Sequence, residues 1–128
     1  MEDTRKRILV ADDDFDYLEQ MKIFIESFGY EIITAESQKE CEELIEETKP
    51  DLAIFDLMME NEDSGFILSY KLKKKYPDVP VIIATSVTAE TGYNFENDAH
   101  DWIKADKFME KGIRPDQLQR EINKLLKM

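Results

Sequence analysis

The fold is decided by the stretch ILVADDD at residues 8–14, in which four apolar residues end in three consecutive carboxylates. A short apolar run of this kind is typical of a strand that is buried on both faces. The stretch LAIFD at residues 52–56 repeats the pattern with a single carboxylate at its end. Parallel sheets bring the carboxyl ends of their strands to one edge, where ligands bind. The two stretches therefore predict a parallel sheet with an acidic edge.

Short apolar runs alternate with longer helical segments along the rest of the chain. Further strands are predicted near residues 32–33, 81–84 and 107–110, and apolar residues recur at helical spacing between most of them. A helix is also expected within residues 86–106, although the apolar residues there fit no single period. The alternation predicts an α/β fold with five parallel strands, five helices and helices on both faces of the sheet.

The composition excludes several classes of protein. The chain has 17 basic and 29 acidic residues, and its net charge of −12 at pH 7 disfavours direct binding to nucleic acid or to anionic membranes. No apolar run approaches the roughly 20 residues of a membrane span. The single cysteine, Cys41, cannot form an internal disulfide. We therefore expect a cytoplasmic protein with no nucleic-acid or membrane partner.

Polar residues from four strands are expected at the same edge of the sheet. Thr85 ends the fourth predicted strand and Lys111 follows the fifth. Asp12, Asp13 and Asp56 would repel one another there, and a divalent cation such as Mg²⁺ removes that cost. A carboxylate nucleophile, a metal ion, a hydroxyl and an ammonium are together the parts of a phosphoryl-transfer site.

Each of these residues has an ordinary explanation when taken alone. Threonine is common in strands, and a lysine near a strand end is most often a solvated side chain. Asp14 and Asp16 are suited to starting a helix, because carboxylates interact favourably with a helix N-terminus. The combination of residues at one edge is thus more specific than any of its members.

Four segments of the chain resemble, in order, the signature segments of the response-regulator receiver family. These segments are VADDD, IFDLMM, PVIIATS and FMEKG, and they span nearly the whole chain. The resemblance implies a flavodoxin-like, doubly wound fold with strand order 2-1-3-4-5, in one receiver domain over residues 1–128. It also implies a role in two-component signalling. A histidine kinase or a histidine phosphotransfer protein would donate a phosphoryl group in a Mg²⁺-dependent reaction, so the chain would modify itself and would not be a turnover enzyme.

The resemblance also gives each site residue a role. Asp56 matches the phospho-accepting aspartate, and Thr85 and Lys111 match the pair that binds the phosphoryl group. Thr85 and Phe108 match the switch residues. The metal ligands implied are Asp12, Asp13, Asp56 and the backbone carbonyl of Met58.

Phosphorylation is expected to change one face of the domain. A phosphoryl group carries about −1.5 to −2 charges, enough to draw Thr85 inward and to let Phe108 follow. The face concerned is formed by the helix within residues 86–106, the strand at 107–110 and the last helix. We expect it to bind an unidentified downstream protein or a second copy of the chain.

Some positions depart from the family pattern. Glu60 stands where the family commonly has a proline. Gly112 follows Lys111, at the position where the family usually has a proline in the cis form. A cis bond before a residue other than proline costs roughly 2.5 to 4 kcal/mol, so either the bond is trans or packing holds the strain. These departures leave open a degenerate receiver that acts as a protein-binding module without phosphorylation. In the family that the chain resembles, the positions of Met58 and Val87 flank the path of the water that attacks the phosphorylated aspartate. Apolar side chains cannot orient that water, so the resemblance implies slow hydrolysis of the phosphorylated form.

Three other kinds of protein fit the sequence poorly. A flavin-binding protein of the same fold would need a phosphate-binding loop at residues 12–14, where the carboxylates would repel the flavin phosphate. A calcium loop beginning at Asp12 would need glycine at Tyr17 and glutamate at Ile23. An aspartate-nucleophile phosphatase would need a second aspartate at Met58.

Overall fold

The structure is a computed structural model that describes residues 5–59, 61, 63–85 and 105–126. Its elements, in chain order, are β1 (Arg7–Ala11), α1 (Phe15–Ser27), β2 (Glu31–Ala35), α2 (Gln38–Glu47), β3 (Leu52–Asp56), α3 (Ser64–Lys75), β4 (Val81–Thr85), β5 (Lys107–Glu110) and α4 (Pro115–Leu126). The described part thus has four helices where the sequence predicted five. The other helix was expected within residues 86–106, of which 86–104 lie outside the described residues.

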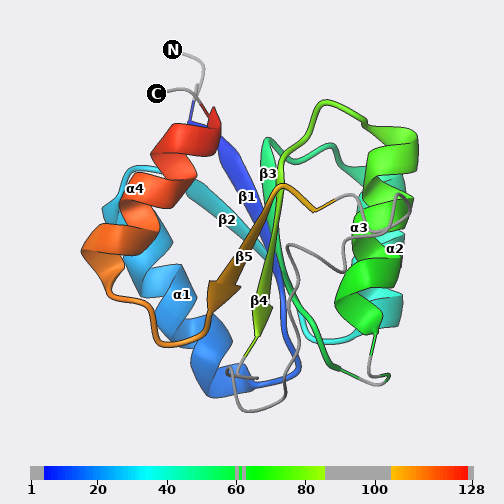
Figure 1. Cartoon of the computed structure of the whole chain (residues 1–128), viewed down its shortest axis with the longest axis horizontal. Coiled ribbons are helices and arrows are strands. Elements are labelled where there is room, and N and C mark those ends of the chain that lie inside the picture. Colours follow the sequence, from blue (N-terminus) through cyan, green and yellow to red (C-terminus); the bar gives the residue numbers. More distant parts are fainter. Residues whose placement is uncertain (1–4, 60, 62, 86–104, 127–128) are drawn as a thin grey trace.

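The sheet has the predicted topology. Five strands are ordered β2-β1-β3-β4-β5, and every neighbouring pair is parallel. Helices α1 and α4 cover one face of the sheet, and α2 and α3 cover the other (Figure 1). The doubly wound α/β fold expected from the alternation of strands and helices is therefore confirmed.

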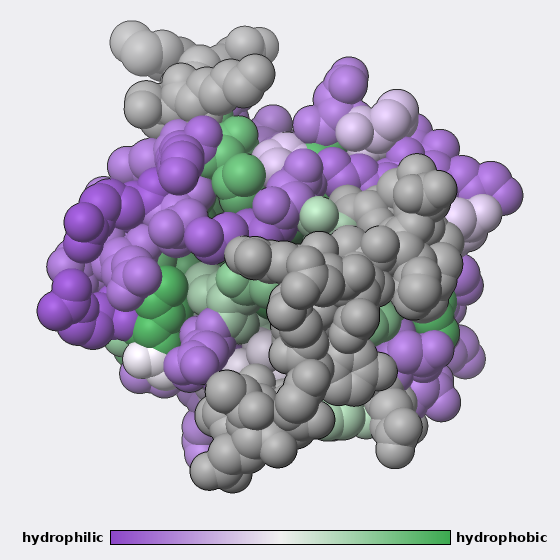
Figure 2. All heavy atoms as spheres, in the orientation of Figure 1, coloured by the Kyte–Doolittle hydropathy of each residue, from purple (hydrophilic) through white to green (hydrophobic). Residues whose placement is uncertain are grey.

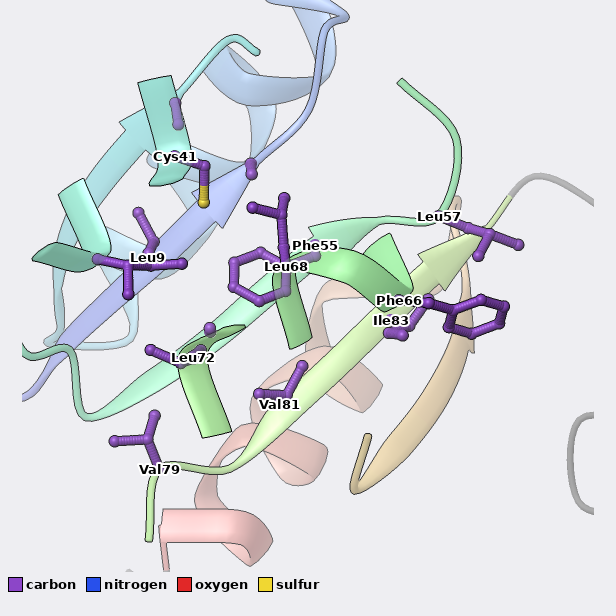
Figure 3. Close-up of a cluster of buried hydrophobic side chains, with 14 residues drawn as sticks. Leu9, Cys41, Phe55, Leu57, Phe66, Leu68, Leu72, Val79, Val81 and Ile83 are labelled. Carbon is purple, nitrogen blue, oxygen red and sulfur yellow. The ribbon is translucent and has the colours of Figure 1, made fainter. Parts of the chain in front are cut away.

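Two apolar clusters hold the layers together, one on each face of the sheet. β3 serves both, because Ile54 faces α1 and α4 whereas Phe55 faces α2 and α3. Figure 3 shows the cluster between the sheet and helices α2 and α3, in which Leu68 and Leu72 of α3 pack with Phe55. Burying a side chain of this size stabilises the fold by about 1.5 to 3 kcal/mol. Because successive side chains of β3 pack on opposite faces of the sheet, this strand, which ends in Asp56, is anchored to both helical layers.

Helix α1 starts directly after the acidic stretch. The side chain of Asp14 accepts hydrogen bonds from the backbone N–H groups of Asp16 and Tyr17, at 3.0 and 3.3 Å. This is the capping role that the sequence suggested for Asp14. The helix is followed by Gly29, whose φ of 95° lies in the left-handed region that favours glycine.

The parts of α1 and α4 that are visible in Figure 2 are mostly hydrophilic. Among the described residues, the exposed large hydrophobic side chains are Phe15, Ile23, Met58 and Tyr70. No helix in the described part of the chain is long and apolar enough to cross a membrane. Cys41 is fully buried in the cluster of Figure 3, and burial raises its pKa, so it packs as a small hydrophobic residue.

Gly65, at the start of α3, lies against the backbone that leaves β3. Its N–H donates to the carbonyl of Leu57 at 2.9 Å. A Cβ at this position would lie 2.8 Å from the carbonyl oxygen of Asp56 and 2.8 Å from Cα of Leu57. Real Cβ atoms do not approach backbone so closely, and therefore α3 or the end of β3 would have to shift.

Gly65→Ala is accordingly expected to lower the free energy of unfolding by about 2 kcal/mol, the usual cost of overpacking. Urea unfolding measures the change. Lys74→Ala, an exposed change on the same helix, should stay within about 0.5 kcal/mol of the unaltered chain. Equal stability of both variants would mean that the backbone near Asp56 can shift without lowering the free energy of unfolding.

Candidate functional site

Four strands bring the predicted site residues to one edge of the sheet. Asp12 follows β1, Asp56 ends β3, Thr85 ends β4 and Lys111 follows β5. The strands are in register there, since Asp56 pairs with Ala84 of β4. The edge lies at the arrowheads of β4 and β5 in Figure 1. The structure thus brings together the carboxylates, the hydroxyl residue and the lysine that the sequence predicted.

The three predicted metal-binding carboxylates form a compact cluster. One carboxylate oxygen from each of Asp12, Asp13 and Asp56 can be chosen so that all lie within 4.8 Å of one another. Asp12 is fully buried and Asp56 is 6% exposed, whereas Asp13 is exposed. Oδ1 of Asp12 accepts a hydrogen bond from the N–H of Asp14 at 2.8 Å. Clustered carboxylate oxygens are suitable ligands for a hard divalent cation.

Lys111 supplies the internal counter-charge. Its Nζ lies 2.6 Å from Oδ2 of Asp12 and 3.3 Å from Oδ2 of Asp56. The same atom lies 4.8 Å from the centre of the Tyr17 ring, over its face. The ammonium is therefore held by two carboxylates and an aromatic ring.

The electrostatics of the site follow from burial. Burial, with the charge of Asp12 adding to it, raises the pKa of Asp56 to about 6, and Lys111 opposes the shift. Burial also raises the pKa of Asp12, against the hydrogen bond from Lys111. Burial lowers the pKa of Lys111, but Asp12 and Asp56 outweigh it and the net shift is upward. A cation at this site would favour the ionised form of both buried carboxyls.

The two predicted switch residues lie on neighbouring strands. Thr85 is buried at the end of β4, and its carbonyl accepts a hydrogen bond from the N–H of Lys111 at 2.9 Å. Phe108 on β5 is half-buried and packs edge-on against Phe66 of α3, with ring centres 6.3 Å apart. Phe108 is thus in contact with the core beside α3.

The positions that depart from the family pattern are partly described. Among the described residues no peptide bond is cis, so the bond between Lys111 and Gly112 is trans, and Gly112 has a φ of 90°. The side chain of Met58 is 42% exposed. Glu60 and Val87 lie outside the described residues, and slow hydrolysis stays a prediction.

Tyr17 is a site residue that the sequence did not predict. Its ring supports Lys111 from the first turn of α1, and burial raises its pKa. The feature of the sequence that could have pointed to Tyr17 is its position five residues after Asp12, in the helix that follows the acidic stretch. Helical spacing alone could not show that the ring faces the end of β5.

Comparisons with known proteins agree with this geometry. The family model of the response regulator receiver domain matches residues 8–123. The phosphate regulon transcriptional regulatory protein PhoB of Pseudomonas aeruginosa is 29% identical over 125 residues, covering 95% of this chain and 52% of that protein. The alkaline phosphatase synthesis transcriptional regulatory protein PhoP of Bacillus subtilis is 27% identical over 122 residues, covering 95% and 49%. The chain spans about half the length of the curated relatives it matches.

Solved structures agree as well. A CheY-like receiver domain protein from Methanospirillum hungatei has a TM-score of 0.82 and 29% identity, covering 97% of this chain and 95% of that one. The response regulator TrrA of Thermotoga maritima, solved in complex with Mg²⁺ and BeF, has a TM-score of 0.79 and 30% identity, covering 94% and 98%. The chain therefore belongs to the response regulator receiver domains, which are signalling domains of two-component systems and not turnover enzymes.

Proposed function

We propose that the chain is a phospho-accepting receiver, in which Asp56 takes a phosphoryl group from a phosphohistidine of a histidine kinase or a histidine phosphotransfer protein. The observation that carries this proposal is the position of Lys111, whose ammonium lies 2.6 Å from Asp12 and 3.3 Å from Asp56. It brings a cation to the carboxylate that would react. Asp56 also stands at the end of a buried strand, where its position is well fixed.

Asp56 is the proposed nucleophile. One of its carboxylate oxygens forms a bond to phosphorus while the bond from phosphorus to the histidine nitrogen breaks, and that nitrogen keeps the electron pair. Lys111 and the Thr85 hydroxyl donate to the phosphoryl oxygens in this proposal. The ammonium then exchanges part of its contact with Asp56 for contact with the new phosphoryl group.

Mg²⁺ is the proposed cofactor. Its ligands would be Asp12, Asp13, Asp56 and the backbone carbonyl of Met58, and when bound it would neutralise charge on the phosphoryl oxygens. The support is the cluster of three carboxylates, two of them buried with raised pKa values. The similar protein TrrA was solved in complex with Mg²⁺ and BeF, which agrees with this choice of metal.

The signal would leave through the face that contains β5 and α4. Thr85 and Phe108 are the proposed switch residues, and the contact between Phe108 and Phe66 is the one that would have to change. The partner is an unidentified downstream protein or a second copy of the chain. The relatives PhoB and PhoP are named as transcriptional regulatory proteins, which agrees with a downstream effector. A cytoplasmic location is part of the proposal, because a single cysteine suits a reducing compartment.

The proposal is tested by incubating the chain with Mg²⁺ and a small acyl phosphate such as acetyl phosphate, followed by intact mass measurement. We expect the mass of one phosphoryl group to be added, and no addition when the metal is chelated. A chain that reacts with neither the small donor nor a panel of histidine kinases would instead be a binding module that works without phosphorylation.

A further inference from the structure

A network of polar side chains joins α2 and α3 to the loop that follows Asp56. The Gln38 network consists of Gln38, Glu42, Asn61, Ser64 and Lys71. Oε1 of Gln38 accepts hydrogen bonds from Oγ of Ser64 at 2.8 Å and from Nδ2 of Asn61 at 3.2 Å. Nε2 of Gln38 donates to Oε2 of Glu42 at 3.0 Å, and Nζ of Lys71 donates to the same oxygen at 2.7 Å. The network thus runs from α3 through α2 to the loop.

The loop end of the network is tightly bonded. Ser64 is fully buried, and its Oγ accepts a hydrogen bond from the N–H of Asn61 at 3.1 Å. The carbonyl of Asn61 accepts hydrogen bonds from the N–H groups of Met59 and Ser64, at 3.2 and 3.3 Å. Gln38 therefore contacts the side chain of Asn61, a residue whose backbone carbonyl holds the N–H of Met59, and also the side chain of Ser64, the first residue of α3.

Met58 lies between two fixed points of this loop. On one side the carbonyl of Leu57 accepts a hydrogen bond from Gly65 at 2.9 Å. On the other side Met59 is bonded to Asn61, which Gln38 holds against α2. The side chain of Met58 is itself exposed, so packing of that side chain contributes little to its position. The backbone of Met58 is accordingly placed by its neighbours.

We propose that Gln38 is a positioning residue for the metal site, because it holds the loop in which the carbonyl of Met58 is presented. This inference rests on the proposed function, in which that carbonyl is a ligand. Mg²⁺ requires nearly octahedral geometry with ligands at about 2.0 to 2.1 Å. A neutral carbonyl is drawn to the ion less strongly than a carboxylate, so it must be placed before the ion binds. Loss of a partner that orients a metal ligand in this way typically lowers metal affinity by roughly 10- to 100-fold.

The first test replaces Gln38 by methionine, which has a similar length and makes none of these hydrogen bonds. We expect the affinity for Mg²⁺, measured by titration calorimetry, to fall about tenfold. Hydrogen exchange of the amides of Met59, Asn61 and Ser64 should become faster, while that of β1 stays unchanged. Gln38→Glu keeps an oxygen that accepts from Ser64 and Asn61, but it replaces the donor to Glu42 by a second carboxylate, so it should restore both values only in part. Unchanged affinity in Gln38→Met would overturn the proposal.

A matched pair of variants separates the network from general effects of charge. Glu46 of α2 pairs with Lys75 of α3 at 2.8 Å, one turn further along than Glu42 and Lys71. Glu42→Ala and Glu46→Ala each remove one negative charge and one ion pair between the same helices. The first also removes the acceptor for Nε2 of Gln38, so it should weaken Mg²⁺ binding more than the second. Equal effects would assign the change to charge and would contradict a role for the network.

The unaltered chain separates failure of this inference from failure of the proposed function. No binding of Mg²⁺ by the unaltered chain would refute the metal site itself. Normal binding by the unaltered chain and by Gln38→Met alike would refute only the role of Gln38. Exchange rates at Asn61 and Ser64 that do not differ between the two chains would show, whatever the metal does, that Gln38 does not hold the loop.

Discussion

Asp56→Asn is expected to abolish phosphorylation by a small acyl phosphate while the fold is retained. The amide that replaces the carboxylate is a very weak nucleophile toward phosphorus, and it also removes one of the three clustered carboxylates proposed to bind the metal. Asparagine has nearly the same shape as aspartate, so the buried end of β3 should pack as before. Intact mass after incubation with the donor and Mg²⁺ gives the result directly.

The same variant should be more stable than the unaltered chain at neutral pH without metal. The pKa of Asp56 is raised by burial and by Asp12 from an ordinary value of 3.8 to about 6. A carboxyl whose pKa is raised by folding contributes stability that is fully present below pH 4 and is lost as the pH rises through about 6. The shift corresponds to about 3 kcal/mol, because one pKa unit is worth about 1.4 kcal/mol. Asparagine does not ionise and avoids this loss.

Urea unfolding of both chains in chelator, at several values between pH 4 and pH 7.5, measures the difference. We expect Asp56→Asn to gain stability relative to the unaltered chain as the pH rises, and the difference to be small at pH 4. Asp78→Asn, a change at an exposed position, serves as the control and should neither block phosphorylation nor show the pH-dependent gain. A phosphorylated Asp56→Asn would refute Asp56 as the acceptor, and a constant difference in stability would refute the cost of its burial.

The backbone framework of the site could be predicted because each functional residue adjoins a strongly apolar run. Asp12, Asp56 and Thr85 each end or directly follow a stretch whose burial is evident from sequence. Once the strands are parallel and adjacent, those three positions must meet at one edge. The location of Lys111 followed in the same way from the short run at residues 107–110, which the structure assigns to β5.

The contacts made by long side chains across elements could not be predicted. Tyr17 and Gln38 are the clearest cases, since each lies in the first turn of a helix and acts on a residue of another element. Which way such a side chain points depends on how the helix is rotated on the sheet, and the apolar period fixes that rotation only coarsely. The bounds of the helix expected within residues 86–106 could not be predicted for a related reason, because the apolar residues there follow no single period.

Lys111→Met is expected to lower the free energy of unfolding by about 2 kcal/mol at pH 7 in the absence of metal. The change leaves the fully buried carboxyl of Asp12 without its ion pair, and removing one partner of a buried pair is strongly destabilising. The Lys111 side chain is 19% exposed, so solvent screens part of this effect. Folding raises the pKa of Lys111, and its contribution is therefore present at neutral pH and lost only above its ordinary value of 10.5. On the acid side the loss should shrink below about pH 6, where Asp56 takes up a proton.

Mg²⁺ should compensate for this loss. Nζ of Lys111 lies 2.6 Å from Oδ2 of Asp12, and the proposed metal would bind the same carboxylate, so binding in the unaltered chain should weaken that ion pair. The variant has no ammonium to displace, so the gain in melting temperature on adding Mg²⁺ should be larger in Lys111→Met than in the unaltered chain. Lys107→Met is the matched control, because Lys107, at the start of β5, pairs with Glu121 of α4 at 3.5 Å and touches neither Asp12 nor Asp56 in the described structure. Equal gains in all three chains would mean that the lysine and the metal do not compete for Asp12.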